Sequence, residues 1–407
     1  MKKPRIFINM HYLEIGGAER ALIGLLCALD SDRVDVDLFL NQHTGEFMRY
    51  VPKGVRLLPE IGAYSAIERP IRQILREGHF AIAAARMAAK VRNAWHRLRH
   101  RSELPDASIF QHVAHCVSPW LPSLKHLGRY DLAISFLTPH NIVAEKVDAA
   151  RRIAWIHTDY TRIGIDVAAE LPVWSRYDYI ASISTDCTKA FLQLFPSLES
   201  RIIEIHNILS PALVRSQAQE FEPAEYAGVE GTIICSVGRI CEAKNYDNVP
   251  RVAQMLKARG MKFHWFIIGP GSQEEVLRIM SETGTDDVIS LLGTRANPYP
   301  YIAGCDLYLQ PSRYEGNSVT VREAQILHRP VIITRYGTSA DQVKDGTDGV
   351  ICEMDNHRIA EAIYRVANDD ALRKRITAHL ATADFGNESE VQKIYHLIQS
   401  ISNHRIV

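Results

Sequence analysis

Short runs of β-branched and aromatic residues alternate with helix-length segments along this chain, and this alternation constrains the fold most. It is typical of parallel sheets whose strands are joined by covering helices. In the first half the sequence predicts strands over Arg5–Met10, Val34–Leu40, Asp131–Leu137, Arg152–Ile156, Tyr179–Ser184 and Ile202–Ile205. In the second half it predicts strands over Thr232–Val237, His264–Ile268, Val288–Leu292, Asp306–Gln310, Val331–Thr334 and Val350–Glu353. Helices are predicted over segments such as Ala18–Leu29, Asn248–Arg259 and Gln273–Thr283.

The length of the chain suits two such sheets. A chain of 407 residues accommodates two domains of about 200 residues each. Residues 209–231 contain two prolines and two glycines without clear periodicity, which favours a linker there. We therefore predict an α/β protein of two Rossmann-like, doubly wound domains facing across a cleft. The expected boundaries are an N-terminal domain over 1–208, a linker over 209–231, a C-terminal domain over 232–385, and a C-terminal helix over 386–407 that packs back on the N-terminal domain.

The amino-acid composition indicates which binding partners and which cellular compartment to expect. The 47 basic residues balance the 47 acidic ones, so no global field favours nucleic acid, and no nucleic-acid partner is expected. The seven cysteines are scattered, which argues against a disulfide framework or a zinc site. The apolar run Ile6–Ile8 is too short for a secretory signal. We expect a soluble protein located in the cytoplasm.

Two glutamates stand near the end of a predicted strand. Glu315 should lie in a loop, and Glu323, after seven intervening residues, within a helix that begins near Ser318. The amides of Asn317 to Thr320 would then form an anion-receptive helix N-terminus. This arrangement offers acceptors for sugar and ribose hydroxyls and donors for a diphosphate. The alternative is that Thr320 and Glu323 merely form a capping box.

Two cations follow another predicted strand. After Thr232–Val237, Gly238 leads into a loop that carries Arg239 and, five residues on, Lys244. Arginine offers phosphate oxygens a planar fork and lysine a compact point charge. The alternative is ordinary solvated surface charge.

Two further candidates lie in the first half. Gly16 and Gly17 follow a strand and precede a helix, where a glycine pair lets the backbone approach a ligand. A tight turn explains them equally well, because they do not form the three-glycine dinucleotide fingerprint. His157 stands at the carboxyl end of the strand Arg152–Ile156, as either a site residue or a structural histidine.

The ordered set of motifs resembles the retaining glycosyltransferases with the GT-B fold, family four, which is rich in bacterial polysaccharide-assembly enzymes. The resemblance covers nearly the whole chain. It runs through Gly16–Arg20, His157, Ile205–Asn207, Val237–Arg239, Lys244–Asn245, Ile268–Gly271, Leu292–Gly293, Asn297–Tyr301, Glu315–Glu323 and Arg329–Ile332. The segments Asn317–Val321 and Tyr336–Ser339 depart from the commoner family pattern, which leaves the sugar unspecified.

The resemblance implies a role for each candidate residue. The N-terminal domain would bind the acceptor and the C-terminal domain the nucleotide-sugar. Arg239 and Lys244 would bind the donor diphosphate and stabilise it as leaving group, while Glu323 binds the ribose. The residues implied to act in catalysis are Glu315, His157, Arg239 and Lys244. The residues implied to bind substrate are Gly16, Gly17, Asn207, Gly238, Arg295 in the base-binding loop, Gly316, Asn317, Ser318, Val319 and Glu323.

The activity implied is transfer of a hexose-type sugar from a nucleotide-sugar, with a UDP-sugar favoured. The acceptor would be a glycan or a lipid-linked glycan in capsule, O-antigen or exopolysaccharide assembly. Transfer would retain the anomeric configuration without a metal or any other cofactor, by front-face attack or through a covalent intermediate. One alternative is a sugar-nucleotide-binding subunit without catalysis. Another is a nicotinamide-dependent oxidoreductase, against which the missing three-glycine fingerprint argues.

The segment 66–101 is strongly basic. It holds nine Lys or Arg residues against two acids, with apolar residues at helical spacing. This pattern predicts a basic amphipathic helix in peripheral contact with an anionic membrane, at its inner face. The alternative is a helix whose apolar side faces the core and whose basic back is solvated.

Overall fold

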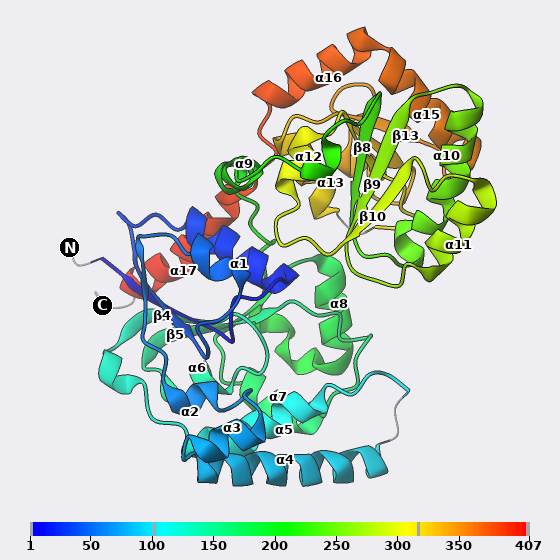
Figure 1. The fold of residues 1–407 in the computed structure, drawn as a ribbon. Coiled ribbons are helices and arrows are strands. Elements are labelled where there is room, and N and C mark those ends of the chain that lie inside the picture. The colour runs from blue at the N-terminus through cyan, green and yellow to red at the C-terminus, as the bar shows by residue number, and fades with distance from the viewer. Residues whose placement is uncertain (1–2, 101–102, 316–317, 404–407) are drawn as a thin grey trace. The chain divides into compact units, whose positions relative to one another are not determined.

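The computed structural model describes residues 3–100, 103–315 and 318–403. The chain divides into two compact units. Unit 1 comprises Met1–Leu209 together with Asn387–Val407, and unit 2 comprises Ser210–Gly386. Figure 1 shows the sheets and helices of each unit.

Unit 1 is built on a parallel sheet of seven strands in the order β3-β2-β1-β4-β5-β6-β7. Its strands are β1 (Arg5–Met10), β2 (Asp35–Leu40), β3 (Val55–Leu57), β4 (Tyr130–Ser135), β5 (Ala149–Ile156), β6 (Tyr179–Ser182) and β7 (Ile202–Glu204). Its helices are α1 (Gly17–Ala28), α2 (Gly62–Ser65), α3 (Ile71–Arg76), α4 (Phe80–Arg99), α5 (Ser108–Val117), α6 (Asn141–Lys146), α7 (Val167–Trp174), α8 (Thr185–Leu194) and α17 (Val391–Asn403).

Unit 2 is built on a parallel sheet of six strands in the order β10-β9-β8-β11-β12-β13. Its strands are β8 (Thr232–Val237), β9 (Phe263–Ile268), β10 (Ile289–Gly293), β11 (Leu307–Gln310), β12 (Val331–Thr334) and β13 (Val350–Cys352). Its helices are α9 (Pro211–Ala218), α10 (Val249–Ala258), α11 (Glu274–Thr283), α12 (Tyr299–Gly304), α13 (Val319–Ile326), α14 (Ser339–Gln342), α15 (Asn356–Asn368) and α16 (Asp370–Thr382).

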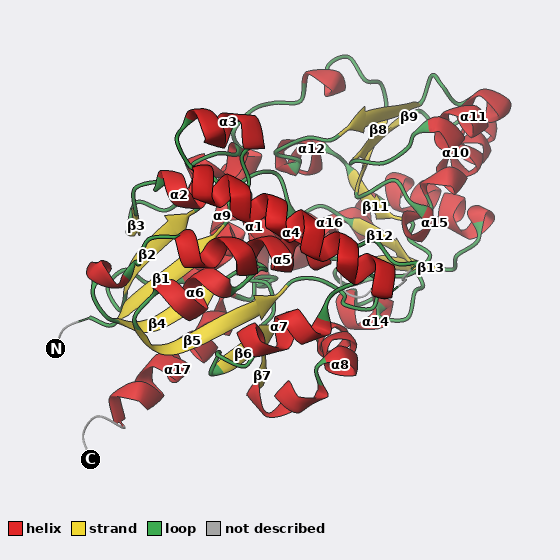
Figure 2. Ribbon diagram, turned by 90° about the horizontal axis from the view of Figure 1, so that it is seen from below, coloured by secondary structure: helices red, strands yellow, loops and turns green. Residues whose placement is uncertain are grey.

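The predicted strands are all present, with small differences at their ends. β1, β8 and β12 have the predicted bounds, whereas β5 begins at Ala149 rather than Arg152. Every residue of β12 is buried, as expected for a parallel strand covered by helices on both faces. Figure 2 shows helices on both sides of the strands. The sequence missed β3, which is short and carries Arg56 in its middle.

The segment predicted as a linker contains regular structure. Pro211, which suggested a break in the chain, is the first residue of α9, where its missing N–H costs nothing. The Ser210 hydroxyl accepts the backbone N–H of Leu213 at 3.4 Å and so caps this helix. The C-terminal helix α17 lies in unit 1, where the Asp30 N–H donates to the Tyr395 hydroxyl at 2.7 Å.

The basic segment forms α3 and the longer helix α4. α4 packs along α5 and forms an outer layer of unit 1, visible at the lower edge of Figure 1. Its buried residues are Ile82, Ala83, Ala85, Ala89 and Asn93. Among the helices that the structure describes, none has both the length and the apolar character needed to cross a membrane.

Candidate active site

The predicted cation Lys244 and the predicted carboxylate Glu315 form one cluster in unit 2. The Lys244 ammonium donates to Glu315 Oε1 at 2.5 Å. The same oxygen accepts hydrogen bonds from the Gln310 amide at 3.0 Å and the Ser312 hydroxyl at 2.6 Å. Both charged side chains keep some exposure, 18% for Lys244 and 13% for Glu315. The cluster is therefore held in a fixed orientation and still reaches solvent.

A second ion pair ties together the two loops that carry this cluster. Arg313 donates to both carboxylate oxygens of Asp247, at 3.0 and 2.6 Å. The Arg313 backbone N–H also donates to the carbonyl of Ala243 at 2.8 Å. These loops follow β8 and β11, which are neighbours in the sheet. Site residues at the carboxyl ends of adjacent parallel strands agree with the usual location of ligands in such sheets.

Gly238 lies in close contact with the residues around it. A Cβ atom at Gly238 would lie 3.0 Å from both the Lys244 side chain and the Tyr246 hydroxyl. A Cβ atom at Gly269, whose φ is +150°, would lie 2.0 Å from the Gly238 carbonyl oxygen. Gly269 therefore accepts no side chain, whereas a side chain at Gly238 would require the Lys244 and Tyr246 side chains to shift slightly.

Arg239 lies next to this cluster in sequence but is not part of it. Its side chain is exposed, and no hydrogen bond or ion pair of its guanidinium is found among the described residues. Nothing in the described structure therefore occupies its donors. The buried Tyr246 hydroxyl also has no hydrogen-bond partner among the described residues.

Glu323 lies inside α13 and is completely buried. Its Oε1 accepts a hydrogen bond from the Tyr299 hydroxyl at 2.7 Å. The capping-box alternative is wrong, because the helix begins at Val319 with Ser318 as N-cap. Thr320 is thus already helical, and its hydroxyl bonds the Gln310 side chain at 3.3 Å. Because Glu323 is fully buried, a ribose would reach it only after neighbouring groups move.

The residues predicted to bind the donor at the start of α13 differ in burial. Ser318 is buried, and its N–H donates to Gln342 at 3.4 Å, whereas Val319 is exposed. Gly316 and Asn317 lie outside the described residues.

The guanidinium of Arg295 is held by three protein groups. It bonds the Leu292 carbonyl at 2.7 Å, the Tyr301 hydroxyl at 3.1 Å and Glu225 at 3.0 Å. The side chain of Arg295 therefore stabilises its own loop, and its donors are largely occupied.

In unit 1 the glycine pair precedes α1. A Cβ atom at Gly16 would lie 2.0 Å from a carboxylate oxygen of Glu19, so a side chain here would require the Glu19 carboxylate to move. A Cβ atom at Gly17 would meet nothing within 4 Å. The first glycine is therefore explained by packing within the protein, whereas the second borders open space.

His157 follows β5 directly and lies against Phe136, with ring centroids 4.6 Å apart. Burial lowers the pKa of His157 to about 4, so the ring is neutral at neutral pH. Its Nε2 is buried and has no hydrogen-bond partner among the described residues. A neutral imidazole with one unused nitrogen suits hydrogen bonding to a hydroxyl group.

His140 was missed by the sequence analysis. It is buried, its Nδ1 bonds the Ser135 hydroxyl at 2.8 Å, and its Nε2 has no partner in the described structure. Burial lowers its pKa to about 3, and interaction with His11 and His157 adds to this. Since residues 11, 140 and 157 follow three different strands, only the fold shows that they lie near one another.

Asn207 likewise has a buried oxygen, Oδ1, with no partner among the described residues. Its backbone carbonyl accepts a hydrogen bond from Asn387 at 3.0 Å. The predicted residues thus form two groups. Gly238, Arg239, Lys244, Glu315 and Glu323 lie in unit 2, whereas Gly16, Gly17, His157 and Asn207 lie in unit 1.

Residues 218–379, which lie within unit 2, match the family described as glycosyl transferases group 1. Among curated proteins, the chain is 29% identical over 153 residues to a Campylobacter jejuni enzyme. That enzyme is named N-acetylgalactosamine-N,N'-diacetylbacillosaminyl-diphospho-undecaprenol 4-alpha-N-acetylgalactosaminyltransferase. The chain is 26% identical over 223 residues to the poly(ribitol-phosphate) alpha-N-acetylglucosaminyltransferase of Staphylococcus aureus. The two alignments cover 37% and 48% of this chain and only 41% and 42% of these relatives.

Solved structures agree with the chain over almost its whole length. A TarM variant from S. aureus, in complex with fondaparinux, alpha-GlcNAc-glycerol and UDP, matches with a TM-score of 0.61 at 12% identity. That match covers 97% of this chain and 99% of the other. HepE from Anabaena, in complex with UDP and glucose, matches with a TM-score of 0.56 at 15% identity, covering 98% and 99%. Residues 218–379 of unit 2 are thus similar to the glycosyl transferases group 1 family, and the chain has the GT-B fold of two Rossmann-like domains.

Proposed function

We propose that this protein is a glycosyltransferase that takes a sugar from a nucleoside diphosphate sugar. The observation that carries the proposal is the cluster of Lys244 and Glu315, together with the unengaged guanidinium of Arg239 in the loop that carries Lys244. Two cations and an oriented carboxylate at the carboxyl ends of β8 and β11 suit a diphosphate and the sugar attached to it.

In this proposal the bond between the anomeric carbon and the diphosphate oxygen breaks while an acceptor hydroxyl bonds to the same carbon. Negative charge then builds up on the diphosphate, and Arg239 and Lys244 stabilise it. The leaving phosphate takes the proton of the acceptor hydroxyl, so the sugar is transferred with retention. Two protein cations in these positions supply the charge neutralisation for which other enzymes use a metal ion.

Glu315 orients the reacting sugar in this proposal. For unit 1 we propose separately that His157 bonds a hydroxyl group of a substrate. The unused Nε2 of His157 supports that role, because a buried nitrogen without a partner loses hydrogen-bond energy until a ligand supplies one.

The names of related proteins support the substrate classes. HepE was solved with UDP and glucose, and the C. jejuni relative is named for a diphospho-undecaprenol acceptor. Another relative is named as a capsular polysaccharide biosynthesis glycosyltransferase of S. aureus. We therefore propose a UDP-sugar donor and a glycan or lipid-linked acceptor in capsule, O-antigen or exopolysaccharide assembly.

The proposal is tested with a panel of UDP-, GDP- and ADP-sugars. Thermal denaturation identifies the donor, because a ligand that binds the folded state raises Tm. Transfer is then followed in the presence of membranes that contain candidate acceptors, and NMR determines the anomeric configuration of the product. Donor binding without release of nucleoside diphosphate under any of these conditions would favour the non-catalytic subunit.

The Glu323→Gln variant separates ribose binding from a structural role. If Glu323 binds the ribose, its contacts are similar in the ground and transition states, so the variant should raise the donor KM about tenfold with little change in kcat. If the carboxylate only accepts the hydrogen bond of Tyr299, the side-chain oxygen of glutamine accepts the same bond, so the variant should leave both KM and Tm near the wild-type values. Tyr299→Phe is the matched control, because it removes the same hydrogen bond and leaves the carboxylate in place.

We also propose that α4 binds the surface of an anionic membrane. Its large apolar residues do not face the core, so the core-facing alternative is wrong for them. The exposed fractions are Phe80 66%, Met87 50%, Val91 58%, Trp95 59% and Leu98 75%. At 3.6 residues per turn these five side chains fall within an arc of about 80°. Four of its five buried residues, Ile82, Ala85, Ala89 and Asn93, lie on the opposite side of the helix, so α4 has two separate apolar faces.

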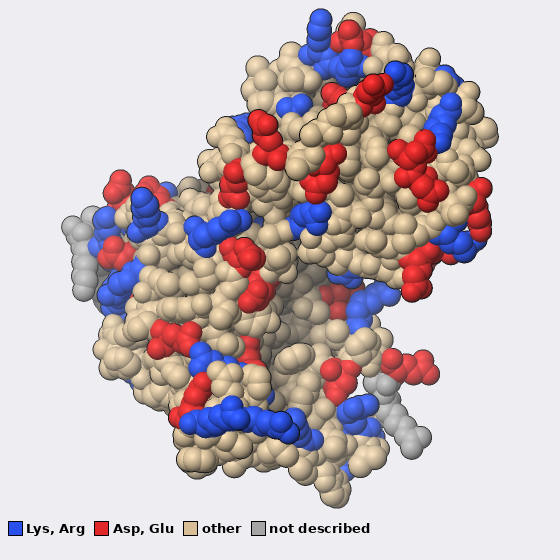
Figure 3. All heavy atoms as spheres, in the orientation of Figure 1, with Lys and Arg blue, Asp and Glu red and all other residues tan. Residues whose placement is uncertain are grey.

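Basic residues flank the exposed apolar stripe. Lys90 and Arg97 lie on one side of it and Arg92 and Arg99 on the other, and all four are exposed. Figure 3 shows Lys and Arg side chains gathered along α4. An apolar stripe between two rows of cations is suited to a helix that lies in the interface of an anionic leaflet.

A Trp95→Asp variant should reduce binding to phosphatidylglycerol-containing vesicles by at least about tenfold, since burial of one large side chain contributes about 2 kcal/mol. Sedimentation with vesicles, with and without the anionic lipid, measures this. Leu277 lies on α11 of unit 2, and 46% of its surface is exposed. The Leu277→Asp variant is the matched control and should bind the vesicles as the wild type does. Absence of vesicle binding by the wild type would refute the membrane role. Self-association abolished by Trp95→Asp would instead assign the stripe to a second copy.

A further inference from the structure

A cluster of two histidines and one aspartate in unit 1 lies apart from the predicted site residues. His96 belongs to the last turn of α4, His112 to α5, and Asp166 is the N-cap of α7. One ligand atom from each of the three residues lies within 4.8 Å of the others. His112 is completely buried, and the side chains of His96 and Asp166 are 18% and 15% exposed.

The hydrogen bonds around His112 fix the orientation of its ring. Asn93 Nδ2 donates to the Asp106 carboxylate at 2.8 Å, which places Asn93 Oδ1 toward His112. This oxygen is 3.0 Å from His112 Nδ1, and since an amide oxygen only accepts, Nδ1 carries the hydrogen. A histidine whose Nδ1–H is donated in this way has Nε2 as its metal-binding atom.

Nε2 of His112 points at an oxygen that also only accepts. It is 2.9 Å from Asp166 Oδ2, and Nδ1 of His96 is 3.4 Å from the same oxygen. The other carboxylate oxygen of Asp166 accepts the Ala169 N–H at 3.1 Å, which holds the carboxylate in place. A cation must therefore lie between Nε2 and Oδ2, either a proton or a metal ion. A proton would join two of these atoms, whereas a metal ion joins all three.

The separations suit a transition metal. Tetrahedral zinc with ligand distances near 2.1 Å places its ligand atoms about 3.4 Å apart. The separation of 3.4 Å between His96 Nδ1 and Asp166 Oδ2 agrees with this value, and the separation of 2.9 Å between His112 Nε2 and the same oxygen is shorter. Two imidazoles and a carboxylate favour zinc or a similar divalent transition metal over magnesium or calcium.

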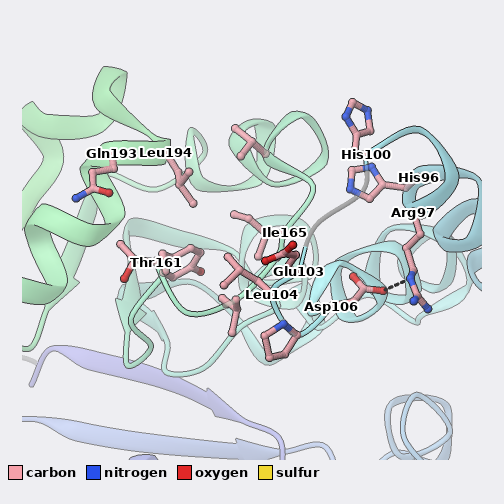
Figure 4. A pocket seen from close by; sticks show the side chains of 15 residues that line it. His96, Arg97, His100, Glu103, Leu104, Asp106, Thr161, Ile165, Gln193 and Leu194 are labelled. Atoms are coloured by element: carbon pink, nitrogen blue, oxygen red, sulfur yellow. Dashed lines mark ion pairs between the residues drawn. The ribbon is translucent and has the colours of Figure 1, made fainter.

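A metal ion bound by these three residues would have space for a fourth ligand. His96 lines a cavity of about 960 Å³. Figure 4 shows His96 and His100 side by side at the end of α4, with Arg97, which pairs with Asp106. The ring centroids of His96 and His100 are 4.8 Å apart. A water molecule or the His100 ring is available to complete four-coordination.

We propose that His96, His112 and Asp166 bind one zinc ion, which fastens the end of α4 to α5 and to the start of α7. This site goes beyond the proposed transferase activity and is formed within unit 1 alone. It departs from the expectation, drawn from the scattered cysteines, that the chain has no zinc site. The ion would anchor the outer helix, and it takes no part in the chemistry proposed for Lys244 and Glu315.

The test uses the full chain without a polyhistidine tag, stripped of metal with EDTA and dialysed. Cobalt is titrated while the visible absorption of tetrahedral Co²⁺ is recorded, and zinc is then added to displace it. The wild type should bind one equivalent of cobalt, lose the absorption on addition of one equivalent of zinc, and gain several degrees in Tm with zinc.

His96→Ala and Asp166→Asn should abolish the cobalt absorption and the zinc-dependent gain in Tm. Asparagine caps a helix as well as aspartate does, so Asp166→Asn removes the anionic ligand and keeps the cap. His115→Ala is the control, since His115 is an exposed residue of the same helix α5, and this variant should behave as the wild type. The proposal is overturned if the wild type binds no stoichiometric metal, or if His96→Ala and Asp166→Asn bind it as the wild type does.

Discussion

The Arg239→Ala variant should lose about two orders of magnitude or more in kcat/KM, since it removes a cation that stabilises charge on the leaving diphosphate. Its Tm should equal that of the wild type, because the exposed Arg239 side chain makes no hydrogen bond or ion pair among the described residues. Steady-state kinetics with the identified donor and thermal denaturation measure the two effects. An undiminished rate would remove Arg239 from the site.

Two further variants make this prediction specific. Arg365→Ala removes another exposed arginine of unit 2, on α15, and should leave the rate unchanged. Lys244→Ala should lower the rate as strongly as Arg239→Ala. It should also cost about 1–3 kcal/mol in the free energy of unfolding, because it leaves the largely buried carboxylate of Glu315 without its cation. Loss of stability in Lys244→Ala without loss of rate would make the ion pair purely structural.

The Glu315→Gln variant should lower kcat by about a hundredfold while nucleotide binding persists. The amide has nearly the same shape as the carboxylate but carries no charge, so it cannot hold the sugar and Lys244 in the same way. Donor kcat from initial rates and the Kd of the free nucleotide separate the two effects. A normal kcat in Glu315→Gln would refute the role of the carboxylate.

A double-mutant cycle tests whether Lys244 and Glu315 act as one unit. Because the two side chains are in direct contact, the combined loss in Lys244→Ala/Glu315→Gln should be much smaller than the sum of the single losses. Ser312→Ala is a milder probe, because it removes one of the hydrogen bonds that orient the carboxylate and leaves both charges. Additive losses would show that the two residues act independently.

Much of the fold follows from the periodicity of the sequence. Buried parallel strands such as β8 and β12 are continuous apolar runs bounded by polar loops, and such runs are visible without a structure. β3 was missed because three residues with an arginine between them carry no such signal. The two apolar faces of α4 were also beyond prediction. Helical spacing shows that a stripe is apolar, whereas only packing against α5 shows which stripe is covered.

The candidate site was predicted in part. Glu315 and Lys244 were identified separately from local motifs, and their contact, across 71 positions of sequence, appeared only in the fold. The sequence analysis left Glu323 as either a ribose ligand or part of a capping box. The spacing of residues along a helix could not show that Glu323 is completely buried. Arg295 was identified from the resemblance, as part of the base-binding loop, whereas its contact with Glu225, across 70 positions of sequence, appeared only in the fold.

Isothermal titration of UDP, GDP and ADP into the wild type and into Arg239→Ala tests the central claim most directly, because it asks whether unit 2 binds a nucleoside diphosphate through this loop. We predict that one of the three nucleotides, UDP by preference, binds the wild type with one site per chain. Arg239→Ala should weaken its Kd about tenfold or more, since hydrogen bonds to a charged group contribute about 1.5–3 kcal/mol. Arg365→Ala should bind as the wild type does. Binding of none of the three nucleotides, or equal Kd values for the wild type and Arg239→Ala, would contradict the account.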